Sequence, residues 1–196
     1  MSALYAAEHR GLRELHAGAR QLVKHWRRLA GRLDGRCAAV LEGGAAEAER
    51  VRSELARESE VRGVPGFPAA SGAGARFAGL HNAGDLMLER NQAMRGAVLD
   101  VQWLVTLVAY LERLAATRGD DGLAALHADW GARLAAVEER ARITAIELGS
   151  DPAFAVTPAE TGALGRAGHR IAVAMGGAGE AVDGSAIGRA ARRFAR

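Results

Sequence analysis

Apolar residues recur at helical spacing over most of this chain, and the longest such stretch runs from residue 76 to residue 118 without a proline. Written as heptads, it forms one apolar stripe that is interrupted mainly by Asn91 and Glu112. A stripe sustained over this length predicts a helix. Its second half carries leucines, Trp103 and Tyr110 on the remaining faces. Because a helix that is apolar nearly all round has to be buried, we expect this one at the centre of the fold.

The predicted central helix is interrupted by Asp100 and Gln102, so its unbroken apolar length falls short of the ~20 residues that a bilayer span needs. It is followed by Gly119-Asp120-Asp121-Gly122, which predicts a tight turn with an aspartate available as a cap. A further amphipathic helix is predicted over about 121–149. The short connection implies that the two helices form an antiparallel hairpin.

A second long seam occupies the start of the chain. Its apolar positions alternate at spacings of three and four, which is typical of a coiled coil or a long bundle helix; they are Leu12, Leu15, Ala19, Leu22, Trp26, Leu29 and Leu33. Cys37 and Val40 continue the register, so we expect the helix to run to about Glu42. Each glycine costs about 1 kcal/mol in a helix interior, which makes Gly43-Gly44 the expected break before an acidic helix over 45–62. The alternative is one continuous helix from 3 to 62.

Residues 63–75 hold two prolines and four glycines and predict a loop. Near the other end, Thr157-Pro158-Ala159-Glu160 has the pattern of a helix start. Residues 161–188 contain eight glycines among many alanines, which predicts one or two short helices docked on the rest, or a segment that orders on binding. We therefore predict an all-α fold: an elongated antiparallel bundle of three to four long helices over 1–149, with a Gly/Ala-rich appendage over 150–196.

Composition and charge narrow the class of protein further. Residues 1–36 carry eight basic and three acidic groups, whereas residues 37–62 carry four basic and six acidic groups. Such segregation suits packing between neighbouring helices as well as binding of an external ligand. A single cysteine excludes an internal disulfide framework. Because the first residues reach a charge at Glu8 without a long apolar run, we expect no secretory signal and a cytoplasmic protein.

The strongest functional signal is a basic face on the first predicted helix. At 100° per residue, its cations fall within about 120° of arc, opposite the apolar stripe; the candidate anion- or partner-binding residues are Arg10, Arg13, Arg20, Lys24, Arg27 and Arg28. Arginine-rich faces bind phosphates and carboxylates through charge-assisted hydrogen bonds. The alternative is a solvated face that is partly neutralised by glutamates of the following helix, at positions 47, 49, 54, 58 and 60.

Catalytic and metal chemistry find little support in the sequence. The chain has no Glu-x-x-His pair of the kind found in metal-binding bundles, and His9 and His16 lie on the basic face, which repels cations. Cys37 falls on the apolar stripe, where a thiol acts as a small apolar side chain. Asn91 occupies a core-type position, where an amide can fix helix register. We expect no catalytic residue, no metal and no cofactor.

The pattern as a whole favours a non-enzymatic interaction protein, such as an adaptor, an assembly factor or an export chaperone, with a protein partner or a second copy of the chain. The first alternative is electrostatic binding of nucleic acid or anionic membrane through the same basic face. The second is a helical-bundle enzyme or cofactor carrier.

Overall fold

The computed structural model describes residues 4–63, 88–160 and 162–184, and within them the fold is all-α, as predicted. The predicted loop from 64 onward, residues 76–87 of the predicted central helix and the last twelve residues lie outside the described part. The elements are α1 (Ala6–Ala30), α2 (Gly35–Val61), α4 (Arg90–Thr117), α5 (Asp121–Glu147), the short 3-10 helix η1 (Leu148–Ser150), α6 (Pro152–Ala155) and α7 (Ala163–Gly184).

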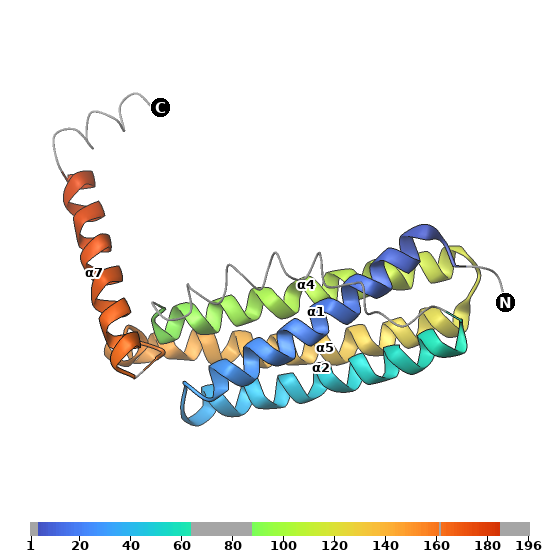
Figure 1. Cartoon of the computed structure of the whole chain (residues 1–196), viewed down its shortest axis with the longest axis horizontal. Helices are drawn as coiled ribbons and strands as arrows, with labels where there is room; N and C mark the ends of the chain where they lie inside the picture. The colour runs from blue at the N-terminus through green and yellow to red at the C-terminus, as the bar shows by residue number, and fades with distance from the viewer. Residues whose placement is uncertain (1–3, 64–87, 161, 185–196) are drawn as a thin grey trace.

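Four of these helices form an elongated bundle of two antiparallel hairpins (Figure 1). Helices α1 and α2 make one hairpin and α4 and α5 the other, and the hairpins meet where α1 packs on α4 and α2 packs on α5. Helix α1 runs antiparallel to α4, since Gly11 lies beside Leu111 and Gly18 beside Leu104. The predicted antiparallel bundle is therefore confirmed.

The core consists of the apolar stripes that the spacing indicated. Every member of the predicted α1 stripe is buried, and the core extends along the inner faces of α2, α4 and α5. Trp26 of α1 and Trp130 of α5 are its largest side chains, and both are fully buried. Burial of a large apolar side chain stabilises a fold by about 1.5–3 kcal/mol, so these stripes are the main source of stability.

The first break in the chain falls at a different place from the one predicted. Helix α1 ends at Ala30, and α2 begins at Gly35 and runs without interruption through Gly43 and Gly44. Both sequence interpretations, a break at 43–44 and a single helix from 3 to 62, are wrong. Leu33 and Cys37 remain buried on either side of the turn, so the apolar register continues although the helix does not. The turn uses Gly35 in the left-handed region, at φ +54°, where glycine is favoured.

Gly44 is placed in the helix by packing. A Cβ at this position would lie 2.1 Å from Cζ3 of Trp26 and 2.8 Å from Cγ1 of Val137. The missing side chain therefore creates the space that the buried indole of Trp26 occupies. This packing outweighs the weak helix propensity of glycine, which misled the sequence interpretation.

The predicted central helix begins later than expected. Leu88 and Glu89 are not helical, and Glu89 caps α4 with extended backbone, at ψ 158°, in a reciprocal arrangement with Gln92. A continuous helix through Leu88 and Glu89 is therefore wrong, whereas the start predicted at residue 76 lies outside the described residues. The predicted turn after this helix is confirmed: Gly119 has φ +78°, and the Asp120 carboxylate accepts a hydrogen bond of 3.0 Å from the backbone N–H of Leu123.

The predicted helix start at Thr157 is also wrong. Residues 157–160 are not helical, and Pro158 forms an isolated bridge with Glu89. Arg90 closes this contact, because its backbone N–H donates to the Thr157 carbonyl and its Nε donates to Thr157 Oγ1 at 2.8 Å. Asn91 has a structural role here: its amide donates to the Ala155 carbonyl at 2.9 Å. The proline and threonine thus serve a junction with α4 in place of a helix cap.

The appendage contains one long helix rather than the predicted short ones. Helix α7 extends away from the end of the bundle instead of docking along it (Figure 1). An ion pair of 2.8 Å between Arg32 and Glu160 lies close to its base. The division of the chain into a bundle over 1–149 and a separate segment over 150–196 stays a prediction.

Among the described helices, α4 alone is long and apolar enough to cross a membrane by length and composition. The sequence analysis counted consecutive apolar residues, and Asp100 and Gln102 interrupt that count. The mean hydropathy of an 18-residue window stays high in spite of these two residues. One such helix is weak evidence, since core helices of water-soluble bundles pass the same test. Only 33% of its most apolar window is buried inside the chain, so part of its apolar surface faces outward.

The two adjacent glycines of α2 give a matched test of this packing. We expect Gly44→Ala to lower the free energy of unfolding by about 1–3 kcal/mol, since the methyl group overpacks the Trp26 site. A Cβ at Gly43 meets no atom within 4 Å, so Gly43→Ala should stabilise the helix by about 0.5–1 kcal/mol. Urea unfolding of both variants measures the two values. Equal effects of the two substitutions would contradict this account of Gly44.

Candidate interaction surface

The six predicted anion- or partner-binding residues lie together on the outer face of α1. The buried leucines fix the rotation of this helix, so the opposite side faces solvent. Five of the side chains are exposed and the sixth, Arg28, is half-buried; the exposed ones are Arg10, Arg13, Arg20, Lys24 and Arg27. We call these six residues the basic face. None of the five exposed members makes an ion pair with another residue in the part of the chain that the structure describes.

The glutamates of α2 pair with other cations. Glu49 binds Arg52, Glu54 binds Arg133, and Glu58 binds Arg62. Glu47 likewise contacts Arg50 and Arg133. The hydrogen bond from Arg52 is the largest cause of the lowered pKa of Glu49. Four of the five acids proposed as neutralising groups are therefore engaged elsewhere, and the positive charge of α1 stays directed outward.

His16 lies at the edge of the basic face next to α2. Its pKa is lowered, first by burial and then by the positive charges of Arg52 and Arg20, while Glu49 opposes the shift. Lowering of this pKa favours the neutral imidazole. His16 therefore adds little charge to the face at neutral pH.

An exposed apolar stripe of α4 lies alongside α1, and the sequence analysis missed it. Leu99, Trp103 and Tyr110 are 65%, 42% and 50% exposed, although an all-round apolar helix was expected to be buried. Trp103 contacts the backbone of α1, because a Cβ on Gly18 would lie 2.4 Å from its Cζ3. The expectation failed because, among the described helices of the bundle, α4 packs on α1 and α5, and these three residues lie on a side that neither of them buries. From here on, the apolar stripe means these three exposed residues of α4, Leu99, Trp103 and Tyr110, as distinct from the buried stripes that form the core.

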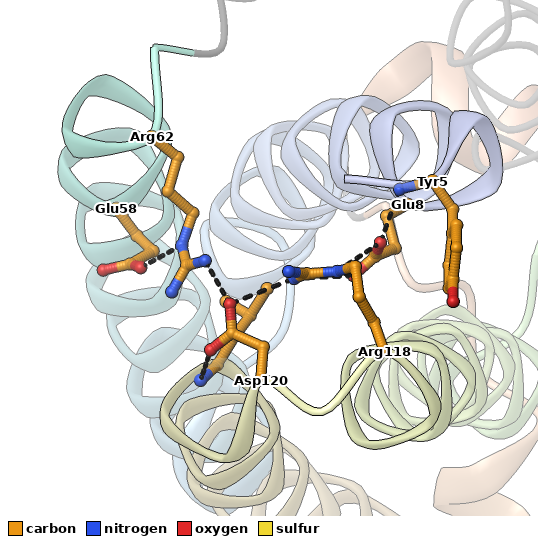
Figure 2. A network of polar contacts seen from close by, with 7 residues as sticks. Tyr5, Glu8, Glu58, Arg62, Arg118 and Asp120 are labelled. Carbon is orange, nitrogen blue, oxygen red and sulfur yellow. Dashed lines mark hydrogen bonds and ion pairs between the residues drawn. The ribbon is translucent and has the colours of Figure 1, made fainter. Parts of the chain in front are cut away.

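At one end of the bundle, a buried network of charges joins α1 to α2 and to the α4–α5 turn (Figure 2). Arg118 binds the Glu8 carboxylate through Nε and Nη2, at 3.0 and 3.2 Å, and donates from Nη2 to Asp120 at 3.1 Å. Arg62 binds Asp120 at 2.5 Å and also contacts Glu58. The Arg118 and Glu8 side chains are only 2% and 1% exposed.

This network is built for structure. Hydrogen bonds from Arg62 and from the Leu123 backbone lower the pKa of Asp120 to about 2, so its carboxylate stays charged at all ordinary pH values. Glu8 also accepts a hydrogen bond of 2.7 Å from the backbone N–H of Tyr5, which caps α1. Every charge drawn in Figure 2 has a partner, and the ends of four helices, α1, α2, α4 and α5, are fixed relative to one another as a result.

The remaining reactive groups have buried, structural settings. Burial lowers the pKa of His127 to about 4, against smaller opposing contributions from the Leu111 backbone and the Glu8 carboxylate. Burial raises the pKa of the Cys37 thiol, which disfavours the reactive thiolate. His25 of α1 contacts Asp100 of α4 at 2.6 Å. Over residues 4–63, 88–160 and 162–184, no group of three or more metal-binding side chains is found.

Comparisons with known proteins give no relative from which a function could be transferred. No family model matches the chain, and neither a curated protein nor a solved structure matches it.

The buried Glu8–Arg118 pair predicts that two arginines near the end of α4, Arg118 and Arg113, contribute very differently to stability. Removal of one partner leaves a buried charge uncompensated, so Arg118→Met should cost about 3–5 kcal/mol of unfolding free energy. Arg113 is exposed, and Arg113→Met should stay within about 0.5 kcal/mol of the parent chain. Thermal and urea unfolding compare the two variants. A loss below 1 kcal/mol for Arg118→Met would show that the network does not hold the helices together.

His127 predicts how stability depends on pH. Its pKa falls from 6.5 in the unfolded chain to about 4 in the folded chain, so the unfolded state takes up a proton first as the pH falls. Its contribution is complete above pH 6.5 and is lost between pH 6.5 and 4, by about 3 kcal/mol. His127→Leu should flatten this part of the profile of unfolding free energy against pH. Parallel profiles for the two chains would contradict the buried, neutral imidazole.

Proposed function

We propose that this chain is a non-enzymatic interaction protein that binds an acidic partner protein through the basic face of α1. The observation that carries the proposal is the set of five exposed cations without an ion pair among the described residues, on one side of a helix whose other side is fully buried. Positive potential concentrated in this way attracts an acidic surface and speeds its association.

The chemistry of the rest of the described chain supports a binding role over a catalytic one. Buried His127 is neutral near pH 7, buried His25 contacts Asp100, the thiol of Cys37 is buried in the core, and the buried carboxylate of Glu8 is paired with Arg118. A general base or a nucleophile requires a reactive group that substrate can reach. The adaptor, assembly and chaperone roles are more specific versions of the same proposal.

A nucleic acid or an anionic membrane is the competing ligand for the same cations. The basic face is a single helix width across and is bordered by apolar side chains of α4, including the aliphatic Leu99. Phosphate backbones are bound mainly through repeated cationic and hydrogen-bonding contacts. A mixed cationic and aliphatic border suits a folded or folding polypeptide better.

Charge reversal tests the proposal with a matched control. The variant Arg13→Glu/Lys24→Glu changes the basic face, whereas Arg57→Glu/Arg140→Glu makes the same change in net charge at exposed positions of α2 and α5. Fluorescence anisotropy of a fluorescein-labelled, glutamate-rich peptide should show binding that weakens with salt. We expect the first variant to lose at least about tenfold in affinity and the second to lose less than about threefold.

Two results would contradict the proposal. Equal losses for the two variants would show that net charge alone governs binding. Tighter binding of a generic DNA duplex or of phosphatidylserine vesicles than of the peptide, with the same sensitivity to Arg13→Glu/Lys24→Glu, would assign the basic face to nucleic acid or to membrane.

A further inference from the structure

We infer that the partner contributes an amphipathic helix, acidic on one side and apolar on the other, which lies along the surface formed by α1 and α4. This inference rests on the proposed function and specifies the chemistry of the partner. It follows from the position of the apolar stripe of α4 directly beside the basic face of α1.

Helices α1 and α4, which carry the two surfaces, lie side by side in the bundle (Figure 1). Gly18 marks the line along which α1 contacts Trp103 and Leu104. Around the axis of α1, at 100° per residue, Gln21, Arg10 and Lys24 lie within about 120° of the direction of Gly18, on the side away from the core. Around the axis of α4, the three residues of the apolar stripe lie within about 140° of the direction of Leu104, also on the side away from the core.

The two surfaces also match in length and level. Because α1 and α4 are antiparallel, with Gly11 beside Leu111 and Gly18 beside Leu104, Tyr110 lies at the level of Arg13 and Leu99 at the level of Lys24. The apolar stripe spans about 16 Å from Leu99 to Tyr110. A docked helix of three turns covers that length, and its width of about 10–12 Å lets it contact both α1 and α4.

Each part of this surface sets a requirement for the occupant. The apolar stripe favours leucine-like or aromatic side chains at helical spacing, as in other cases where a helix binds in a groove. The cations favour glutamate or aspartate on the adjacent side. Glu14 is the one acid on this flank of α1, beside the three cations Arg10, Lys24 and Arg28, so the flank is positive on balance and favours acidic side chains.

The same charges argue against a second copy of this chain as the occupant. Pairing of two apolar stripes would bring two basic faces close together, and like charges at short range oppose association. Stacking of nucleic acid bases on Trp103 and Tyr110 would leave the aliphatic Leu99, 65% exposed at one end of the stripe, without an apolar partner. The occupant that satisfies both surfaces is therefore an acidic amphipathic helix of another protein.

The test uses two fluorescein-labelled peptides of identical composition. One places leucines along a single helical face with glutamates elsewhere, and the other distributes the leucines evenly. We expect the parent chain to bind the amphipathic peptide at least about tenfold more tightly than the scrambled one. The full chain is used throughout, and size-exclusion chromatography with light scattering defines its oligomeric state.

Two double variants locate the binding site. Leu99→Gln/Tyr110→Gln should remove the tenfold preference and leave the weaker binding of the scrambled peptide. Ile143→Gln/Ile146→Gln removes two exposed apolar residues of α5, 40% and 69% exposed, and should leave the preference intact. All four positions are exposed, so folding of both variants is expected to be unaffected.

The outcomes separate this inference from the proposed function. Equal affinity for the two peptides, with both weakened by Arg13→Glu/Lys24→Glu, would overturn the amphipathic helix and leave the acidic partner in place. Insensitivity of both peptides to that charge reversal would overturn both proposals. A dimer of the parent chain that dissociates in Leu99→Gln/Tyr110→Gln, or an oligonucleotide that binds more tightly than either peptide, would assign the apolar stripe to another occupant.

Discussion

The close approach of α1 to α4 is the constraint on which the surface of this protein depends. Gly11 and Gly18 present bare backbone to Leu111, Trp103 and Leu104, so the two helices meet without side chains of α1 between them. This bare-backbone contact is local to Gly11 and Gly18, and it helps to set which residues of each helix stay outside. As a result, the cations of α1 and the apolar stripe of α4 face the same side, a helix width apart.

Polar contacts hold this approach at two levels. The buried Glu8–Arg118 pair fixes the start of α1 to the end of α4, and His25–Asp100 joins the same helices farther along. Charges buried in this way contribute less to net stability than to the choice of one arrangement, because desolvation offsets much of their attraction. The apolar core stabilises the bundle, whereas these pairs determine how α1 is rotated and where it lies along α4.

The sequence predicted the helical class, the antiparallel α4–α5 hairpin and the basic face because each depends on local spacing. The apolar register of α1 placed its leucines inside and its arginines outside, and the structure has both. It could not locate the first turn, since Leu33 and Cys37 keep the register through the turn. Gly44 was interpreted as a break because the indole that fills its missing side chain lies on another helix.

The apolar stripe and the buried network were missed for a related reason. Leu99, Trp103 and Tyr110 read as buried because sequence alone does not say how many neighbours a helix has. The pairing of Glu8 with Arg118 joins residues 110 positions apart, and neither shows a motif around it. Thr157 and Pro158 have the local pattern of a helix start, yet they are not helical and instead contact Arg90 and Glu89. At each position where the local sequence pattern gave a wrong prediction, contacts with residues distant in the sequence determine the structure.

Accessibility of the three tryptophans tests the central claim most directly, because the structure assigns them different environments. Trp26 and Trp130 are fully buried, whereas Trp103 is 42% exposed on the apolar stripe. Acrylamide quenching of the tryptophan fluorescence should therefore reveal one accessible and two protected residues, and Trp103→Phe should remove the accessible one. Protection of all three tryptophans in the parent chain would contradict an open apolar stripe beside the basic face.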